Sequence, residues 1–134
     1  MIVSREQFFA ARPESVRQAR EFVATVLDGW GLLARAEDIR LCLSELATNA
    51  VVHGSGPGHS FLVRLHSDDD VVRLEVQDSC QRQPAVHEPA ATDPSGRGLM
   101  LVASLSDGWG VEDHAPAGKI VWSCFKGAGG TTPC

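Results

Sequence analysis

The sequence predicts a single small domain of the α+β class, and three observations lead to this prediction. Residues 13–28 and 36–53 have apolar side chains at helical spacing. Residues 61–66 and 119–126 alternate between two sets of side chains, as strands do. The chain has 134 residues, which is enough for one hydrophobic core and too few for two domains.

The composition is that of a soluble globular protein and excludes several classes of function. Hydrophobic residues make up 43% of the chain and charged residues 22%, and no uninterrupted apolar segment could cross a bilayer. The net charge of −5 argues against nucleic acid as a main partner, which would require a basic surface. Arg5, Glu6 and Arg12 interrupt the N-terminal region, so it does not resemble a signal peptide. We therefore expect a cytoplasmic protein that binds neither membrane nor nucleic acid.

The four cysteines lie far apart in the sequence, at Cys42, Cys80, Cys124 and Cys134. They form no CxxC pair and no Cys/His pattern of a zinc site. In a cytoplasmic protein this favours free thiols over a disulfide framework.

A short strand and an amphipathic helix are predicted at the N-terminal end. The strand covers Ile2 to Phe9. Pro13 and Glu14 are typical of a first helical turn. Proline is tolerated at the first helical position because the N–H there has no partner within the helix, and an acidic side chain is stabilised by the positive end of the helix dipole. The helix continues to about residue 28, and Gly29 and Gly31 end it.

The second predicted helix, from Ala36 to His53, carries a row of polar side chains. Glu45, Asn49 and His53 are spaced four residues apart, and each such step turns the direction by only about 40°, so all three share one edge. Burying the asparagine amide unpaired would cost on the order of 1–3 kcal/mol. Two interpretations remain open. Either this edge simply meets solvent, or its oxygens bind a hard cation such as Mg²⁺, which shares its ligand shell with water and phosphate.

A hairpin of two strands follows, with residues 61–66 in the first and 71–77 in the second. The apolar residues of the second strand share one face, and Asp78 has the same parity. Its carboxylate is therefore expected on the buried side, at the end of the strand. A charge there is costly without a partner. Asp78 is either a cap for the following loop or a hydrogen-bond acceptor for a ligand.

Residues 81–95 form a long loop that contains three prolines. Loops of this length inside compact domains are usually functional lids or disordered segments. The loop ends at Gly96-Arg97-Gly98-Leu99, ahead of a short apolar helix that continues to Leu105. Two glycines before a helix let the backbone approach a ligand, and the helix start offers free N–H groups to an anion. The same glycines would also serve a flexible loop end that has no ligand.

Two further strands complete the predicted domain, Trp109 to Asp113 and Lys119 to Lys126. We expect the domain to span residues 1–126. The remaining residues, 127–134, are rich in glycine and are expected to be a disordered tail.

Three motifs, in this order along the chain, resemble those of the GHKL ATPases, the superfamily of type II topoisomerases, heat-shock chaperones and sensor histidine kinases. The N box is residues 44–53 (SELATNAVVH), the first glycine box is Val76-Gln77-Asp78, and the second is Gly96-Arg97-Gly98-Leu99. Within the superfamily the chain is most similar to the bacterial anti-sigma-factor serine kinases and related small ATP-binding regulators of actinobacteria. The resemblance covers residues 9–126.

This resemblance implies both a fold and a site. The fold is a two-layer sandwich of a mixed, mostly antiparallel sheet with about three helices on one face, the Bergerat fold. In the site, Asn49 would coordinate the Mg²⁺ that bridges the ATP phosphates, and Glu45 would be the general base for the attacking hydroxyl. Asp78 would accept a hydrogen bond from the exocyclic amine of adenine. Gly96-Arg97-Gly98-Leu99 would surround the phosphates, with residues 81–95 as the lid.

The sequence departs from the family pattern around the adenine position. The first glycine box continues as Asp78-Ser79-Cys80, where the family has Asp-x-Gly, and cysteine adopts positive φ less readily than glycine. Ile120 stands near the position of a family threonine whose hydroxyl assists the adenine aspartate. Arg97 is the only basic residue near the expected phosphates. His53 is interpreted as structural, near the negative end of the helix.

The function implied by the resemblance is that of an ATP-binding anti-sigma factor with serine/threonine protein kinase activity. Such a protein binds a sigma factor and phosphorylates an anti-anti-sigma partner. The alternative, suggested by Cys80 and Ile120, is a non-catalytic or weakly nucleotide-binding module that sequesters a transcription regulator. A slow ATPase that gates its own dimer is a third, less favoured, interpretation. Family analogy suggests a homodimer, although no interface can be identified from the residues.

Overall fold

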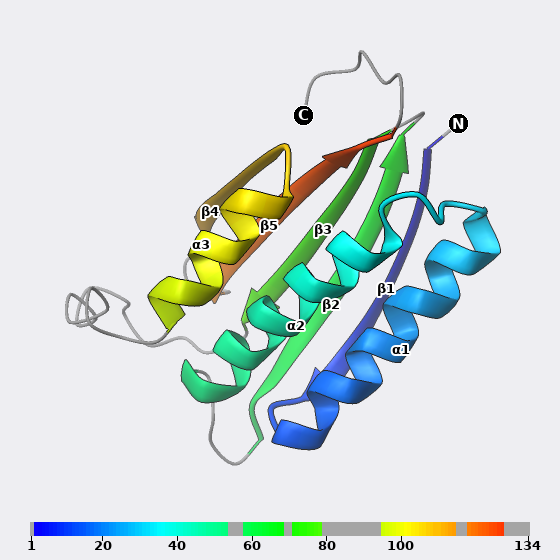
Figure 1. The fold of residues 1–134 in the computed structure, drawn as a ribbon. Coiled ribbons are helices and arrows are strands. Elements are labelled where there is room, and N and C mark those ends of the chain that lie inside the picture. Colours follow the sequence, from blue (N-terminus) through cyan, green and yellow to red (C-terminus); the bar gives the residue numbers. More distant parts are fainter. Residues whose placement is uncertain (1, 54–57, 69–70, 79–94, 115–117, 128–134) are drawn as a thin grey trace.

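The computed structural model describes residues 2–53, 58–68, 71–78, 95–114 and 118–127. All the predicted helices and strands are present in these ranges. No helix among them is long and apolar enough to cross a membrane. Residues 128–134 of the predicted tail lie outside the described ranges. In chain order the elements are β1 (Ile2–Ala10), α1 (Pro13–Trp30), α2 (Ala36–His53), β2 (Ser60–Asp68), β3 (Val71–Asp78), α3 (Ser95–Leu105), β4 (Gly108–His114) and β5 (Gly118–Lys126) (Figure 1).

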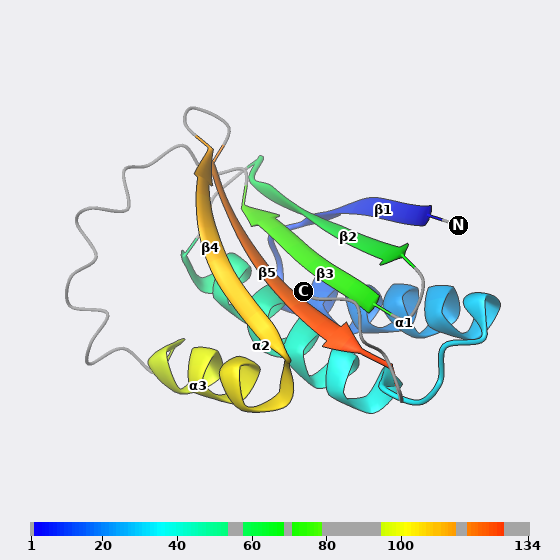
Figure 2. The same ribbon diagram turned by 90° about the horizontal axis from the view of Figure 1, so that it is seen from above.

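The strands form one five-stranded sheet in the order β1-β2-β3-β5-β4. The three helices lie together against one face of this sheet, and none of them covers the other face (Figure 2). The α+β class and the two-layer arrangement are therefore confirmed. Every pairing among these strands is antiparallel, so the expected admixture of parallel pairs is not found. For β2–β3 and β4–β5 the reason is that consecutive strands with short connections cannot make the crossover that a parallel pair needs.

The hydrophobic core lies between the sheet and the helices, with α2 in the middle of the helical layer (Figure 1). A large apolar side chain in such a core contributes roughly 1.5–3 kcal/mol to the stability of the fold when it is fully buried. Because α2 has a helix on either side and the sheet beneath it, its polar residues are restricted to a solvent-facing stripe and the two edges of that stripe. The largest fully buried apolar side chains are Phe61, Phe125, Leu27, Ile39, Leu43, Leu65, Leu74, Val23, Val63 and Val102.

Helix α1 begins at Pro13, as its sequence predicts, and ends at Trp30, two residues later than predicted. Pro13 is in its first turn together with the acidic Glu14. Gly31 ends it with a left-handed φ of 73°, and its N–H donates to the carbonyl oxygen of Asp28 at 3.0 Å. The N–H of Leu32 donates to the carbonyl oxygen further back at Leu27 at 2.9 Å, so the end is a Schellman motif. Gly31 is therefore the helix-ending glycine, because only a residue without a Cβ adopts this conformation at low cost.

The uncovered face of the sheet carries a row of alternating charges that crosses four strands. Arg64 donates to Glu6 at 2.8 Å and to Glu75 at 3.2 Å. Arg73 donates to Glu75 at 2.7 Å and to Glu112 at 3.3 Å. Such pairs at a surface are each worth only about 0–1 kcal/mol. Their main consequence is that this face is polar and its charges are largely neutralised by one another.

Trp122 lies on the same face, between the guanidinium of Arg73 and the backbone of Gly110. The Arg73 guanidinium carbon is 4.5 Å from the centre of the indole ring. On the other side, a Cβ added at Gly110 would meet three atoms of the ring at 2.8–2.9 Å. Glycine is therefore required at this position of β4 so that the indole can lie flat across the strand.

We expect Gly110→Ala to lower the free energy of unfolding by about 1–2 kcal/mol, because the indole must shift to admit the methyl group. Gly29→Ala is the matched control, since nothing lies within 4 Å of a Cβ at that position in α1. It should raise stability by roughly 0.5–1 kcal/mol through helix propensity. Urea unfolding of both variants measures the difference. If Gly110→Ala were as stable as the control, the ring could not lie where the structure has it.

The cysteines only partly follow the expectation from the sequence. Cys42 is free and fully buried, and burial is the largest of the effects that raise the pKa of its thiol to about 12. This thiol is therefore protonated and inert at neutral pH. Cys124 is disulfide-bonded, with its partner outside the described residues, so the prediction of free thiols was wrong for this residue. The long spacings in the sequence did not reveal that folding brings two cysteines together.

Candidate functional site

Two of the predicted site residues lie on α2, at the border between its buried side and solvent. Glu45 and Asn49 are both partly exposed, whereas the intervening Thr48 is exposed. The core-facing side chains of the helix are Ile39, Cys42, Leu43, Leu46, Ala47, Ala50 and Val51. The predicted polar edge is therefore present along at least one turn of the helix.

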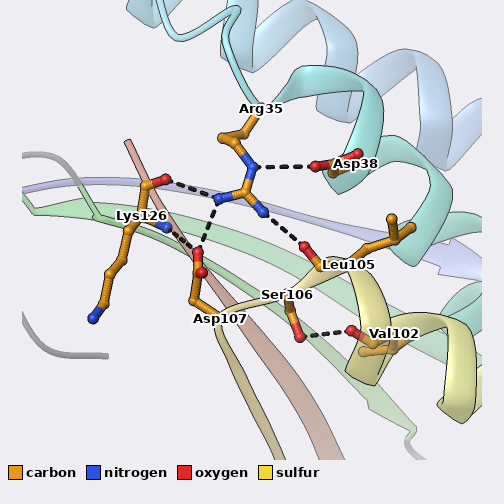
Figure 3. Close-up of polar contacts among 7 residues, drawn as sticks. All are labelled: Arg35, Asp38, Val102, Leu105, Ser106, Asp107 and Lys126. Atoms are coloured by element: carbon orange, nitrogen blue, oxygen red, sulfur yellow. Dashed lines mark hydrogen bonds and ion pairs between the residues drawn. The ribbon is translucent and has the colours of Figure 1, made fainter. Parts of the chain in front are cut away.

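Asp38 shows which neighbour this edge faces. It lies seven residues before Glu45 and eleven before Asn49, and at 3.6 residues per turn these side chains point within about 40° of one another. Asp38 accepts a hydrogen bond from Nε of Arg35 at 3.1 Å. The same guanidinium donates to the carbonyl oxygen of Leu105, at the C-terminal end of α3, at 2.7 Å (Figure 3). The edge that carries Glu45 and Asn49 thus faces α3.

Arg35 joins the start of α2 to the end of α3 and to the sheet. Its Nη1 donates to Asp107 at 2.8 Å and to the carbonyl oxygen of Lys126 at 2.9 Å (Figure 3). Its guanidinium carbon is 5.3 Å from the centre of the Phe125 ring. The backbone N–H of Lys126 also donates to Asp107 at 2.7 Å, and this hydrogen bond, followed by that of Arg35, lowers the pKa of the Asp107 carboxyl. Sequence reasoning missed this network because its members are separated by up to 91 positions.

Because Arg35 at the start of α2 bonds the end of α3, the two helices run antiparallel. The first turn of α3 therefore lies beside the C-terminal half of α2 (Figure 1). This turn contains the backbone of Gly96-Arg97-Gly98, since α3 begins at Ser95 rather than at Leu99 as the sequence predicted. Leu99 packs against the hydrophobic core.

Asp78 reaches the same end of the molecule from the sheet. It is the last residue of β3, partly buried, and two residues after Val76, which belongs to the core. Side chains two apart on a strand share a face, so Asp78 lies on the helix-facing side, as predicted. The end of β3 lies under the C-terminal half of α2 (Figure 1). The structure thus brings Asp78, the Glu45/Asn49 edge and the first turn of α3 to one end of the domain.

The side chains at this end have the chemistry of a site for a metal-bound phosphate. Among the described residues, Glu45 and Asn49 make no side-chain hydrogen bond, so a carboxylate and an amide oxygen remain available one turn apart. Mg²⁺ prefers oxygen ligands and usually keeps several waters and phosphate oxygens. In the described part of the chain there is no group of three or more His, Cys, Asp or Glu side chains that could hold a metal ion. An Mg²⁺ site that relies on phosphate and one amide needs no such cluster.

The register of β3 and β5 shows which residue of β5 lies beside Asp78. The Cα partner of Asp78 is Lys119, whereas Ile120 pairs with Gln77. Val121, two residues beyond Lys119, packs against the core and pairs with Val76. Lys119 therefore shares the helix-facing side with Asp78, and Ile120 points to the opposite face. The side chain alongside Asp78 is a lysine, which sequence reasoning missed because the register of two strands cannot be read from one of them.

Several predicted features lie outside the described part of the chain. Cys80 and residues 81–94 of the predicted lid belong to the range 79–94, which is not described. The backbones of His53 and Arg97 lie in α2 and α3, but their side chains are not described. Their predicted roles therefore remain predictions.

A cavity of about 390 Å³ opens elsewhere in the fold, at the start of α1. It is lined by the ends of β1 and β2, and none of the predicted site residues belongs to it. Its lining residues are Phe8, Phe9, Ala10, Ala11, Arg12, Gly58, His59 and Ser60.

The described part of the chain is thus a two-layer α+β domain, with a five-stranded antiparallel sheet backed by three helices. A family model of the histidine kinase-like ATPase domain matches residues 9–125. The chain therefore belongs to the histidine kinase-like ATPase family, which confirms the resemblance to the GHKL ATPases.

One similar solved structure is that of the RsbU and RsbW domains of Rv1364c from Mycobacterium tuberculosis. The TM-score is 0.67 at 21% sequence identity, over 92% of this chain and 32% of that chain. The present chain thus spans about a third of that protein, and the likeness concerns the fold. A comparison with curated protein sequences found no match.

Proposed function

We propose that this protein is an ATP-binding anti-sigma factor that uses Mg²⁺-ATP to phosphorylate a serine or threonine of an anti-anti-sigma partner. The observation that carries the proposal is the α3-facing edge of α2, where Glu45 and Asn49 lie one turn apart without hydrogen-bond partners among the described residues. The resemblance of the motifs to anti-sigma-factor serine kinases supports it, as does the fold shared with a structure that includes an RsbW domain.

In this proposal each group has a distinct role in holding the nucleotide. Asn49 binds Mg²⁺ through its amide oxygen, and phosphate and water complete the ligand shell. Asp78 accepts a hydrogen bond from the exocyclic amine of adenine. The first turn of α3, with Gly96-Arg97-Gly98 and Leu99, directs backbone N–H groups and one basic residue to the phosphates. The bound Mg²⁺-ATP supplies the phosphoryl group that is transferred.

Glu45 is the proposed general base. Side chains four residues apart on a helix have Cβ atoms about 5–6 Å from each other, so Glu45 can hold a hydroxyl close to a phosphate bound at Asn49. Glu45 has no cationic partner among the described residues, which leaves its oxygens free to accept the hydroxyl proton. Positioning of this kind, together with charge neutralisation, supplies most of the catalysis in phosphoryl transfer.

The alternative proposal is a module that sequesters a transcription regulator without transferring phosphate. The observation in its favour is Asp78-Ser79-Cys80, where a glycine would be expected at the third position. Both proposals place the protein in the cytoplasm with a sigma factor or its antagonist, and both include the homodimer suggested by the family resemblance. They differ in what happens when Mg²⁺-ATP and the partner are both present.

Calorimetric titration with Mg²⁺-ATP tests the nucleotide site. We expect the wild-type protein to bind, and a ligand at about 100 times its Kd should stabilise it by about 2.7 kcal/mol. Asn49→Ala should weaken binding at least about tenfold, equivalent to about 1.4 kcal/mol, because a metal ligand is lost. Thr48→Ala is the matched control, since the exposed Thr48 hydroxyl bonds, among the described residues, only the carbonyl oxygen of Ser44 at 2.7 Å. Equal affinities of the two variants would remove Asn49 from the site.

Incubation of the protein with Mg²⁺-ATP and candidate antagonists distinguishes the two proposals. Label on a serine or threonine of the partner supports the kinase. Nucleotide binding without label on any partner that forms a complex supports the sequestering module.

A further inference from the structure

Lys119 lies beside Asp78 in the sheet, and the inference concerns this pair. The two residues are direct partners across β3 and β5 and lie on the helix-facing side. Directly opposed residues of an antiparallel pair have Cβ atoms about 4.5–5.5 Å apart. The long lysine side chain can therefore bring its ammonium group next to whatever group the Asp78 carboxylate binds.

Lys119 is partly buried, and among the described residues it has no ion-pair partner. An ammonium group that leaves water without a partner carries a desolvation cost. A ligand with a hydrogen-bond acceptor at this position would offset that cost. Ile120 cannot supply a donor here, because its side chain is hydrocarbon and points to the other face of the sheet.

The pair offers one acceptor and one donor at neighbouring positions. The adenine ring presents the complementary pair along one edge, because its exocyclic amine donates and the adjacent ring nitrogen N1 accepts. A carboxylate and an ammonium can satisfy both groups at once, and charged partners make such hydrogen bonds stronger than neutral ones.

We propose that Lys119 is a specificity-determining residue of the nucleotide site, which donates a hydrogen bond to N1 of adenine while Asp78 accepts one from the exocyclic amine. The proposal rests on the nucleotide-binding function proposed above and adds a second base contact to it. In this proposal the Lys119 ammonium takes the place of the family threonine hydroxyl that assists the adenine aspartate from the last strand.

A purely structural role makes a different prediction. On its other side Lys119 is the Cα partner of Asp113 in β4, and a pair between these strands would stabilise the sheet alone. Replacing Lys119 would then lower the melting temperature and leave nucleotide affinity unchanged.

Calorimetry with two nucleotides separates these roles. The probes are Mg²⁺-ATP and the Mg²⁺ complex of 1-deaza-ATP, in which a C–H group replaces N1. For the wild-type protein we expect 1-deaza-ATP to bind at least about tenfold more weakly than ATP, because it leaves the lysine donor unpaired. Lys119→Met should weaken ATP binding by a similar factor and leave 1-deaza-ATP binding unchanged. Lys119→Arg keeps a donor and should retain part of the preference for ATP.

Lys126→Met is the matched control, because Lys126 is the other lysine of the chain and lies at the far end of β5 on the opposite face. It should bind both nucleotides as the wild type does, and melting curves show that each variant is folded. The proposal is overturned if Lys119→Met binds ATP as tightly as the wild type, or if it weakens both nucleotides equally, which would indicate general attraction of the triphosphate. If the wild-type protein binds neither nucleotide, the proposed function fails as well. That result is distinct from one in which the wild type binds ATP and only the role of Lys119 is overturned.

Discussion

Glu45→Gln should lower the rate of partner phosphorylation by about 10²–10⁴-fold, the range that a positioned general base contributes. The change keeps the size and hydrogen-bonding ability of the side chain but removes its capacity to take a proton from the attacking hydroxyl. Mg²⁺-ATP affinity should stay close to that of the wild type, because the proposed metal ligand is Asn49. Transfer of labelled phosphate to the partner under single-turnover conditions measures the effect directly.

Glu37→Gln is the matched control for this prediction. It makes the same chemical change on the same helix, at an exposed position in the first turn of α2. Its phosphorylation rate should equal that of the wild type. If Glu45→Gln retained the wild-type rate, Glu45 would not be the base. If it lost nucleotide binding as well, its role would be in holding the nucleotide instead.

Arg35→Met should lower the free energy of unfolding by about 3 kcal/mol. The substitution keeps the apolar stem but removes charge-assisted hydrogen bonds, each worth about 1.5–3 kcal/mol, to acceptors that are partly buried or, at Asp107, exposed. The acceptors affected are the carbonyl oxygens of Leu105 and Lys126 and the carboxylates of Asp38 and Asp107. Urea unfolding followed by circular dichroism gives the value.

The comparison variant is Arg17→Met, in which an exposed arginine is removed from α1. Arg17 lies 3.8 Å from Glu21, and the two side chains are 84% and 69% exposed. A pair of this kind is worth no more than about 0.5 kcal/mol. A loss in Arg35→Met that did not exceed the loss in Arg17→Met would mean that the network of Figure 3 does not stabilise the fold. A larger loss would show that Arg35 holds α2 and α3, the two helices on either side of the proposed site.

The local parts of this fold were predictable from the sequence because their signals are local. The start of α1 at Pro13 follows from the constraints on proline, and the row of Glu45 and Asn49 follows from the helical period. Asp78 could be assigned to the buried side because the alternation of β3 extends through it. In each case neighbouring residues along one element contain the whole argument.

The parts that were missed depend on contacts between elements. The position of Lys119 beside Asp78 depends on the register of β5 on β3, in which a shift of one residue reverses the face of the strand. Arg35 forms its network with residues 70–91 positions away, and no periodicity indicates such a contact. The disulfide of Cys124 was missed for the same reason.

The central claim is that a metal-bound nucleotide lies between the C-terminal half of α2 and the first turn of α3. Substitution of Mn²⁺ for Mg²⁺ tests it most directly, because a paramagnetic ion broadens the NMR signals of nearby nuclei. With Mn²⁺-ATP, the side-chain amide signal of Asn49 should disappear first, together with backbone signals of Gly96 and Gly98, while Glu21 on α1 stays sharp. Broadening centred on any other part of the molecule, with a sharp Asn49 signal, would contradict the claim.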